Sequence, residues 1–169
     1  MSTTVKEHEQ AATLERLYTE SEIRNAWANF CFVLDGDGRE PGSVQAMIRA
    51  IFADDGIFEG VTPTDEVLFR WRMHGSSGEL TALDGLTVAE LLARSKAHAA
   101  ARGLHTHEGH ARHYPISIVF DTVTATRVST RTLVLRLGAG EHEELVYIDQ
   151  WVRTKRGWRK QHSRLRLPF

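Results

Sequence analysis

The hydrophobic residues of this chain change their spacing partway along it. In the first part they recur at intervals of three and four, the period of an amphipathic helix. From Ile116 onward they alternate with polar residues, the period of a half-buried strand. Helices first and strands last predict an α+β fold, in which the helices pack against one face of a curved antiparallel sheet.

Signals at the ends of the helical segments divide the first part further. A short helix is expected over residues 6–18, and residues 19–22 have the form of a capping box that would begin a second helix. Residues 35–38 end this second helix, and its buried face carries Ile23, Trp27, Phe30, Cys31 and Leu34. Pro41 is placed to open a third helix running to Phe52. The residues at 87–101 are rich in Ala and Leu and predict a fourth.

The strands are predicted from alternation and from the turns between them. A turn at residues 75–78 follows one strand, and residues 155–157 form a hairpin turn that leads into the last strand. The predicted strands cover residues 57–59, 67–73, 116–120, 128–134, 146–153 and 158–167.

Composition narrows the class of protein. The 169 residues are 41% hydrophobic and 25% charged, which is typical of one globular domain over residues 1–169. With a net charge of -1, the chain lacks the positive electrostatic field that is typical of a nucleic-acid-binding protein. A single cysteine, Cys31, excludes an internal disulfide framework. The polar start and the short apolar runs predict a cytoplasmic protein without a membrane segment.

Asp35 is the first candidate for chemistry. Trp27, Cys31 and Asp35 follow one another at steps of four residues, so all three point the same way from one helix. A carboxylate on a buried stripe is costly unless it is paired or hydrogen-bonded. Asp35 therefore either has a partner in the interior or lies at a frayed helix end and reaches solvent.

Histidines are the second candidates, because four of the nine fall between positions 105 and 113. If this segment is a regular strand, His105, His107 and His113 share one face, and His110 points to the other. Three imidazoles on one face are able to bind zinc, iron or copper, although surface histidines without a role fit the same pattern. His110 begins the stretch that leads into the sheet.

Four stretches, taken in order, carry a resemblance to a known family. They are residues 34–37 with 50–55, His110 followed by Tyr114 and Pro115, residues 147–153, and residues 157–159. With these stretches the chain resembles the SnoaL-like family of the nuclear transport factor 2-like superfamily, which includes polyketide cyclases, scytalone dehydratase and dehydrochlorinases. The resemblance implies a cone-shaped α+β barrel, with a curved mixed or antiparallel sheet around the N-terminal helices, and assembly as a homodimer or homotrimer.

The resemblance also implies a site. Carried over by position, Asp35 pairs with His110, and His110 acts as a general base or acid without a cofactor or metal. The implied enzyme is a dehydratase, isomerase or cyclase for a small ring-containing or polyketide-like substrate. The chain departs from the family at Tyr114, where the related pattern has Asn.

Further residues are candidates for contacting such a substrate. Trp27, Cys31, Tyr114 and Phe58 would line an apolar cone, and the alternative for each is packing in the core. Arg153 is a candidate for binding an oxyanion, or else a surface charge. Two other functions remain open: a non-catalytic ligand-binding or assembly domain of the same fold, and a metal enzyme that uses His105, His107 and His113.

Overall fold

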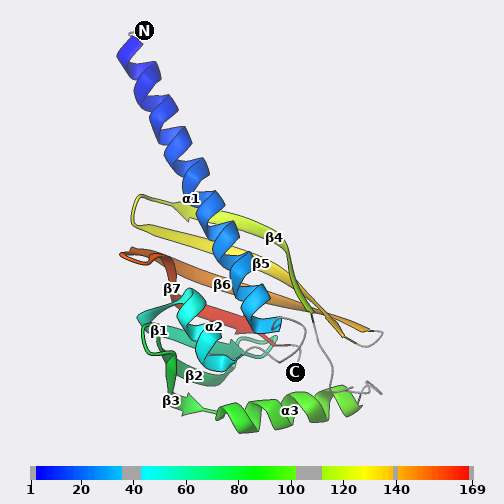
Figure 1. Ribbon diagram of the computed structural model, residues 1–169. Helices are drawn as coiled ribbons and strands as arrows, with labels where there is room; N and C mark the ends of the chain where they lie inside the picture. Colours follow the sequence, from blue (N-terminus) through cyan, green and yellow to red (C-terminus); the bar gives the residue numbers. More distant parts are fainter. Residues whose placement is uncertain (1–2, 36–42, 102–111, 139–140, 168–169) are drawn as a thin grey trace.

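The computed structural model describes residues 3–35, 43–101, 112–138 and 141–167. A seven-stranded sheet curves around the C-terminal half of a long first helix (Figure 1). The helices are α1 (Thr3–Asp35), α2 (Val44–Ile51) and α3 (Val88–Ala101). The strands are β1 (Phe52–Val61), β2 (Val67–His74), β3 (Glu79–Gly85), β4 (Arg112–Val123), β5 (Arg127–Gly138), β6 (Glu141–Thr154) and β7 (Gly157–Arg166).

The order of the strands makes the sheet mixed and open. It runs β3-β2-β1-β7-β6-β5-β4, so β3 and β4 are its edges. β1 pairs with β7 in parallel, and the other neighbouring strands pair antiparallel. The α+β class and the curved mixed sheet around the N-terminal helices are confirmed.

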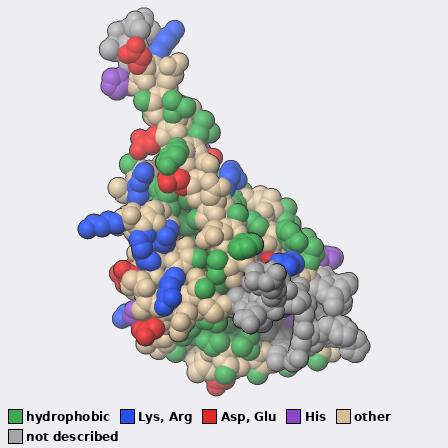
Figure 2. Space-filling model, viewed as in Figure 1, with side chains coloured by type: hydrophobic (Ala, Val, Ile, Leu, Met, Phe, Trp, Pro, Cys, Tyr) green, Lys and Arg blue, Asp and Glu red, His purple; other side chains and the backbone are tan. Residues whose placement is uncertain are grey.

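The prediction of two helices before residue 35 is wrong, because α1 is one continuous helix of 33 residues. No Gly or Pro interrupts residues 3–35, so nothing in the backbone favours a break at the supposed capping box. Thr19 instead lies inside the helix and is buried. The first turns of α1 project from the rest of the molecule (Figure 2), and Leu14, Leu17 and Tyr18 are exposed.

The other predicted elements are found with shifted ends. Ser43 caps α2 by accepting a hydrogen bond from the Ala46 amide at 3.0 Å, whereas Pro41 lies outside the described residues. β1 is longer than the predicted strand over residues 57–59, because it begins at Phe52 and continues to Val61. β3 was not predicted, since its side chains are mostly exposed and show no alternation.

Aromatic rings fill the space between α1 and the sheet. Trp27 of α1 lies edge-on to Tyr147 and Trp151 of β6, with ring centroids 5.0 and 6.5 Å away. A second cluster packs between β1 and β2 and consists of Phe52, Phe58, Phe69 and Trp71. None of the described helices is long and apolar enough to span a membrane.

One ion pair is buried inside this aromatic core. Lys160 Nζ lies 3.1 Å from Asp149 Oδ1, and the Ser163 hydroxyl donates to the same oxygen at 2.6 Å. The ammonium group also lies 3.6 Å from the centre of the Trp27 ring, a cation–π contact. Burial lowers the pKa of Lys160 to about 8, against the opposing effect of Asp149. Burial likewise raises the pKa of Asp149 above its ordinary value.

Candidate functional site

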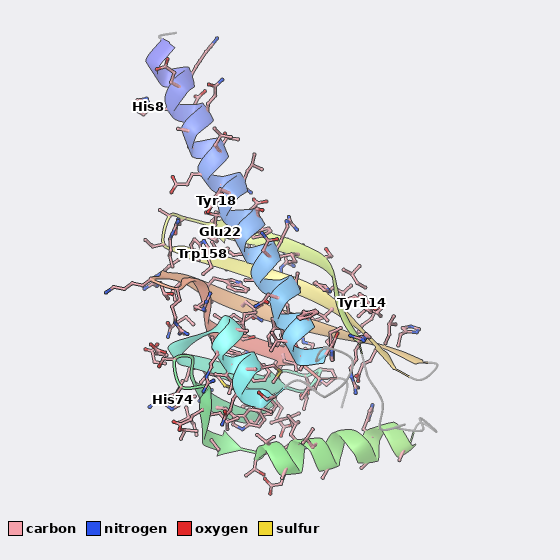
Figure 3. The ribbon with its side chains drawn as sticks, viewed as in Figure 1. His8, Tyr18, Glu22, His74, Tyr114 and Trp158 are labelled. Atoms are coloured by element: carbon pink, nitrogen blue, oxygen red, sulfur yellow. The ribbon has the colours of Figure 1, made fainter. Side chains whose placement is uncertain are left out.

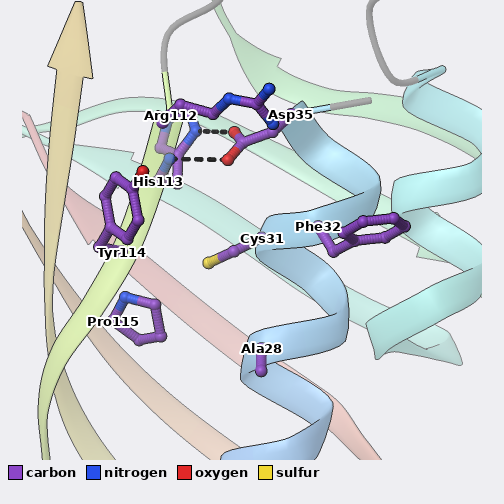
Figure 4. Close-up of a pocket in the computed structure, with 8 residues that line it drawn as sticks. All are labelled: Ala28, Cys31, Phe32, Asp35, Arg112, His113, Tyr114 and Pro115. Carbon is purple, nitrogen blue, oxygen red and sulfur yellow. Dashed lines mark hydrogen bonds and ion pairs between the residues drawn. The ribbon is translucent and has the colours of Figure 1, made fainter. Parts of the chain in front are cut away.

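A pocket of about 320 Å³ lies where the end of α1 meets the start of β4 (Figure 4). The helix contributes residues from one face, at intervals of three and four, and the strand contributes four consecutive residues. The lining consists of Ala28, Cys31, Phe32 and Asp35 from α1 and Arg112, His113, Tyr114 and Pro115 from β4.

Asp35 and His113 form a tightly held pair in this pocket. Asp35 Oδ1 lies 2.6 Å from His113 Nδ1, and the backbone N–H of His113 donates to Asp35 Oδ2 at 2.8 Å. Both carboxylate oxygens are therefore bound by a single residue 78 positions away in the chain. The two side chains are only 7% and 12% exposed. The pair fixes both the ring and the start of the strand against the helix.

The position of Asp35 is costly for the helix itself. As the last residue of α1, it puts a negative charge at the helix C-terminus, where the macrodipole disfavours it by roughly 0.3–1 kcal/mol. Taking the carboxylate out of water adds a further cost. The hydrogen bonds from His113 offset these costs.

Two charged residues on the neighbouring strands, Arg136 of β5 and Glu143 of β6, also act on the histidine. His113 pairs in register with Arg136 of β5, and Arg136 pairs with Glu143 of β6, to which it donates a hydrogen bond at 3.1 Å. Burial lowers the pKa of His113 below its ordinary value, and Arg136 acts in the same direction. Asp35 and Glu143 oppose the shift without reversing it.

This arrangement defines what the histidine is able to do. With a lowered pKa, the imidazole is neutral at pH 7, and its Nδ1–H donates to Asp35. The proton therefore stays on Nδ1, and Nε2 carries the free lone pair of a general base. Within the described part of the chain, no group of three His, Cys, Asp or Glu side chains is placed to hold a metal ion.

Comparisons with known proteins test the fold. No family model matches the chain, and no curated protein matches it in sequence. Among solved structures, an NTF2-like protein with a cystatin-like fold from Novosphingobium aromaticivorans is 18% identical, with a TM-score of 0.51, over 94% of this chain and 87% of that chain. This chain has the NTF2-like fold.

Two further structures of the NTF2-like fold agree. A hexachlorocyclohexane dehydrochlorinase, LinA type 2, is 16% identical, with a TM-score of 0.54, over 93% of this chain and 90% of that chain. An NTF2-like protein of unknown function from Pseudomonas putida is 15% identical, with a TM-score of 0.54, over 90% of this chain and 89% of that chain. At these identities the likeness establishes the fold alone.

Within this NTF2-like fold, three of the predicted site residues line one pocket. They are Asp35, Cys31 and Tyr114. Burial raises the pKa of the Cys31 thiol to about 12, with Asp35 acting in the same direction, so the thiol is unsuited to act as a nucleophile. His110, predicted to be the partner of Asp35, lies outside the described residues, as do His105 and His107.

The other predicted substrate contacts lie away from this pocket. Trp27 is fully buried in the aromatic core, and Phe58 belongs to the cluster between β1 and β2. Arg153 lies near the opposite end of β6 from Glu143, where its guanidinium is 4.0 Å from Glu22 and 5.8 Å from the ring centre of Trp158. In the view of Figure 3, Trp158 and Tyr114 lie on opposite sides of α1.

Five of the eight residues that line this pocket were not predicted as members of the site, namely Ala28, Phe32, Arg112, His113 and Pro115. His113 was assigned to a possible metal set and Arg112 was not considered. The start of the strand decides their position: β4 begins at Arg112, and its first residues line the pocket at the end of α1. Clear alternation begins only at Ile116, so the periodicity of the sequence does not identify His113 rather than His110 as the histidine at the start of the strand.

Proposed function

We propose that this chain is a cofactor-independent lyase, isomerase or cyclase acting on a small ring-containing or polyketide-like molecule by general acid/base catalysis. His113 is the base or acid, and Asp35 orients it. The observation that carries the proposal is the hydrogen-bonded Asp35–His113 pair in the wall of a pocket. A pocket of about 320 Å³ is of the size that binds a small organic molecule.

The reaction class follows from the position of the base. A neutral Nε2 takes a proton from carbon beside a carbonyl or a leaving group, and the protonated ring returns it to carbon or to the departing group. The three outcomes, elimination, isomerisation and cyclisation, share this first proton transfer. The apolar part of the wall, formed by Ala28, Phe32 and Pro115, suits a substrate ring.

The shared first step gives a test that does not require the product to be known. A panel of ring-containing ketones and polyketide-like compounds is incubated with the protein in D₂O, and deuterium uptake at carbon is followed by NMR and mass spectrometry. We expect uptake into at least one compound with the wild-type chain, and none above background with His113→Gln, which is similar in size and cannot act as the base.

A control separates chemistry from folding. His142→Gln changes an exposed histidine on β6 and should leave the exchange rate unchanged. Exchange that persists in His113→Gln would contradict the proposal. Saturable binding of a compound by both proteins, without exchange in either, would favour the non-catalytic ligand-binding alternative.

The lowered pKa of His113 predicts the pH profile of this reaction. Because the free base is the active form, kcat/KM should rise with pH as the ring loses its proton and level off above an inflection below pH 6.5. Arg136→Gln removes a charge that lowers this pKa, so the inflection should move to higher pH. Glu143→Gln should move it to lower pH, because Glu143 acts to raise the pKa. The pH dependence of kcat/KM for the wild type and the two variants tests these shifts. Shifts of the inflection in the opposite directions would exclude His113 as the titrating base.

A further inference from the structure

Arg112 is a cationic residue in the wall of the pocket, next to the proposed base. It is the first residue of β4, half-buried, and lines the same pocket as Asp35 and Tyr114. Figure 4 shows its side chain extending from the strand toward Asp35. Among the described residues, none forms a hydrogen bond or ion pair within 4.0 Å with its guanidinium. Within the described chain, this positive charge in the pocket wall thus has no hydrogen-bond acceptor of its own.

The other arginine beside His113 is in a different situation. Arg136 is held by Glu143 at 3.1 Å and is not part of the pocket lining. Its charge is balanced by a neighbouring carboxylate, whereas both oxygens of Asp35 already accept hydrogen bonds from His113. Of the two guanidinium groups, the one in the pocket wall is therefore the one available to a ligand.

A guanidinium group recognises planar oxyanions. It donates two parallel N–H bonds to a carboxylate, and these charge-assisted bonds are among the stronger hydrogen bonds in proteins. The same group stabilises negative charge that develops on oxygen when a neighbouring base removes a proton from carbon. Arg112 and His113 both line this pocket, so a molecule that fills the pocket is able to contact both of them.

We propose that Arg112 anchors an anionic oxygen of the substrate, and that the pocket selects small ring-containing molecules bearing a carboxylate. This inference rests on the proposed function for the role of His113, and it adds the chemical class of the substrate. Tyr114 and Phe32, which are 49% and 65% exposed, provide apolar surface at the pocket for the ring.

Binding of two matched probes tests the inference without turnover. Benzoate and benzamide have the same shape and differ in charge, and each is titrated into the ¹⁵N-labelled full chain while the amide shifts of His113 and Tyr114 are followed. We expect benzoate to bind more tightly than benzamide to the wild type. Arg112→Gln should weaken the binding of benzoate by about tenfold or more and leave the binding of benzamide unchanged. The affinity of Arg112→Lys for benzoate should be intermediate.

Arg136→Gln is the matched control, because it removes one positive charge next to the same histidine but outside the pocket lining. It should retain the preference for benzoate. Equal binding of the two probes to the wild type, absence of saturable binding of either, or an equal loss in Arg112→Gln and Arg136→Gln would overturn the assignment.

The same series distinguishes this inference from the proposed function. His113→Gln is expected to keep the preference for benzoate while losing deuterium exchange. If exchange is lost as expected but Arg112→Gln binds benzoate like the wild type, the substrate class is wrong and the catalytic proposal stands. If the preference depends on Arg112 but His113→Gln still exchanges deuterium, the catalytic proposal is wrong and the anion site stands.

Discussion

Replacement of Asp35 by Asn is expected to reduce turnover by about 10²–10⁴-fold while leaving the chain folded. The carboxylate accepts two hydrogen bonds, from the backbone N–H of His113 and from its ring Nδ1. An amide has only one oxygen to offer. If that oxygen keeps the backbone N–H, the NH₂ group faces Nδ1 and donates to it.

The consequence is a change of tautomer. A ring that accepts at Nδ1 carries its proton on Nε2, so the lone pair needed by a general base disappears. The loss should appear in kcat, with little change in substrate binding, because Asn and Asp occupy the same volume. ¹⁵N chemical shifts of the His113 ring report the tautomer directly, and steady-state kinetics report the rate.

The fold should tolerate this change. Removing the negative charge relieves its unfavourable interaction with the end of α1, which offsets part of the lost hydrogen bonding. Asp121→Asn is a suitable control, since Asp121 is an exposed residue of β4 paired with Arg131. If Asp35→Asn turns over at the wild-type rate, the orienting role of Asp35 is excluded.

Replacement of Lys160 by Met is expected to destabilise the fold by about 3–5 kcal/mol, the usual cost of removing one partner of a buried ion pair. The methionine matches the length of the lysine stem but leaves Asp149 without a counterion. Asp149 is 0% exposed, and only the Ser163 hydroxyl remains to satisfy its Oδ1 atom. The free energy of unfolding in urea measures the effect.

A second substitution should restore much of this loss. In Lys160→Met/Asp149→Asn the buried charge is gone and the Ser163 hydroxyl still has an acceptor. Lys155→Met, in the exposed turn before β7, is the matched control and should stay within about 0.5 kcal/mol of the wild type. Equal stability of Lys160→Met and the wild type would show that the charged pair contributes nothing to the fold.

Part of this fold could be predicted from the order and periodicity of the sequence. Alternation along the predicted strand 146–153 puts Tyr147, Asp149 and Trp151 on one face, and all three are buried. The helical stripe placed Trp27, Cys31 and Asp35 on the inner side of α1, where they are found. Each of these features depends only on the spacing of hydrophobic residues within one helix or strand. That spacing can be read directly from the sequence.

The candidate site depended on a relation between elements. Pairing Asp35 with a histidine requires the residue at which β4 begins, and three positions separate His110 from His113. The register of β4 against β5 and the packing of α1 on the sheet decide which histidine lies opposite Asp35. Neither relation produces a recognisable pattern in the local sequence. The continuity of α1 was missed for the opposite reason: a strong local motif at residues 19–22 was overridden by uninterrupted helix on both sides.

Because α1 is one uninterrupted helix, the site is sensitive to any inserted residue that rotates Asp35 about the helix axis. Glu22 approaches Arg153 near one end of β6, and Asp35 binds His113 at the start of β4, so a single helix is docked at both ends of the sheet. Each residue turns an α-helix by about 100°. A one-residue insertion between these two anchors would therefore swing Asp35 away from His113, whereas the same insertion before Thr13, in the overhanging turns, would change only the length that projects into solvent. Related chains should therefore differ in the length of α1 before Thr13 and keep the same number of residues between the positions of Glu22 and Asp35.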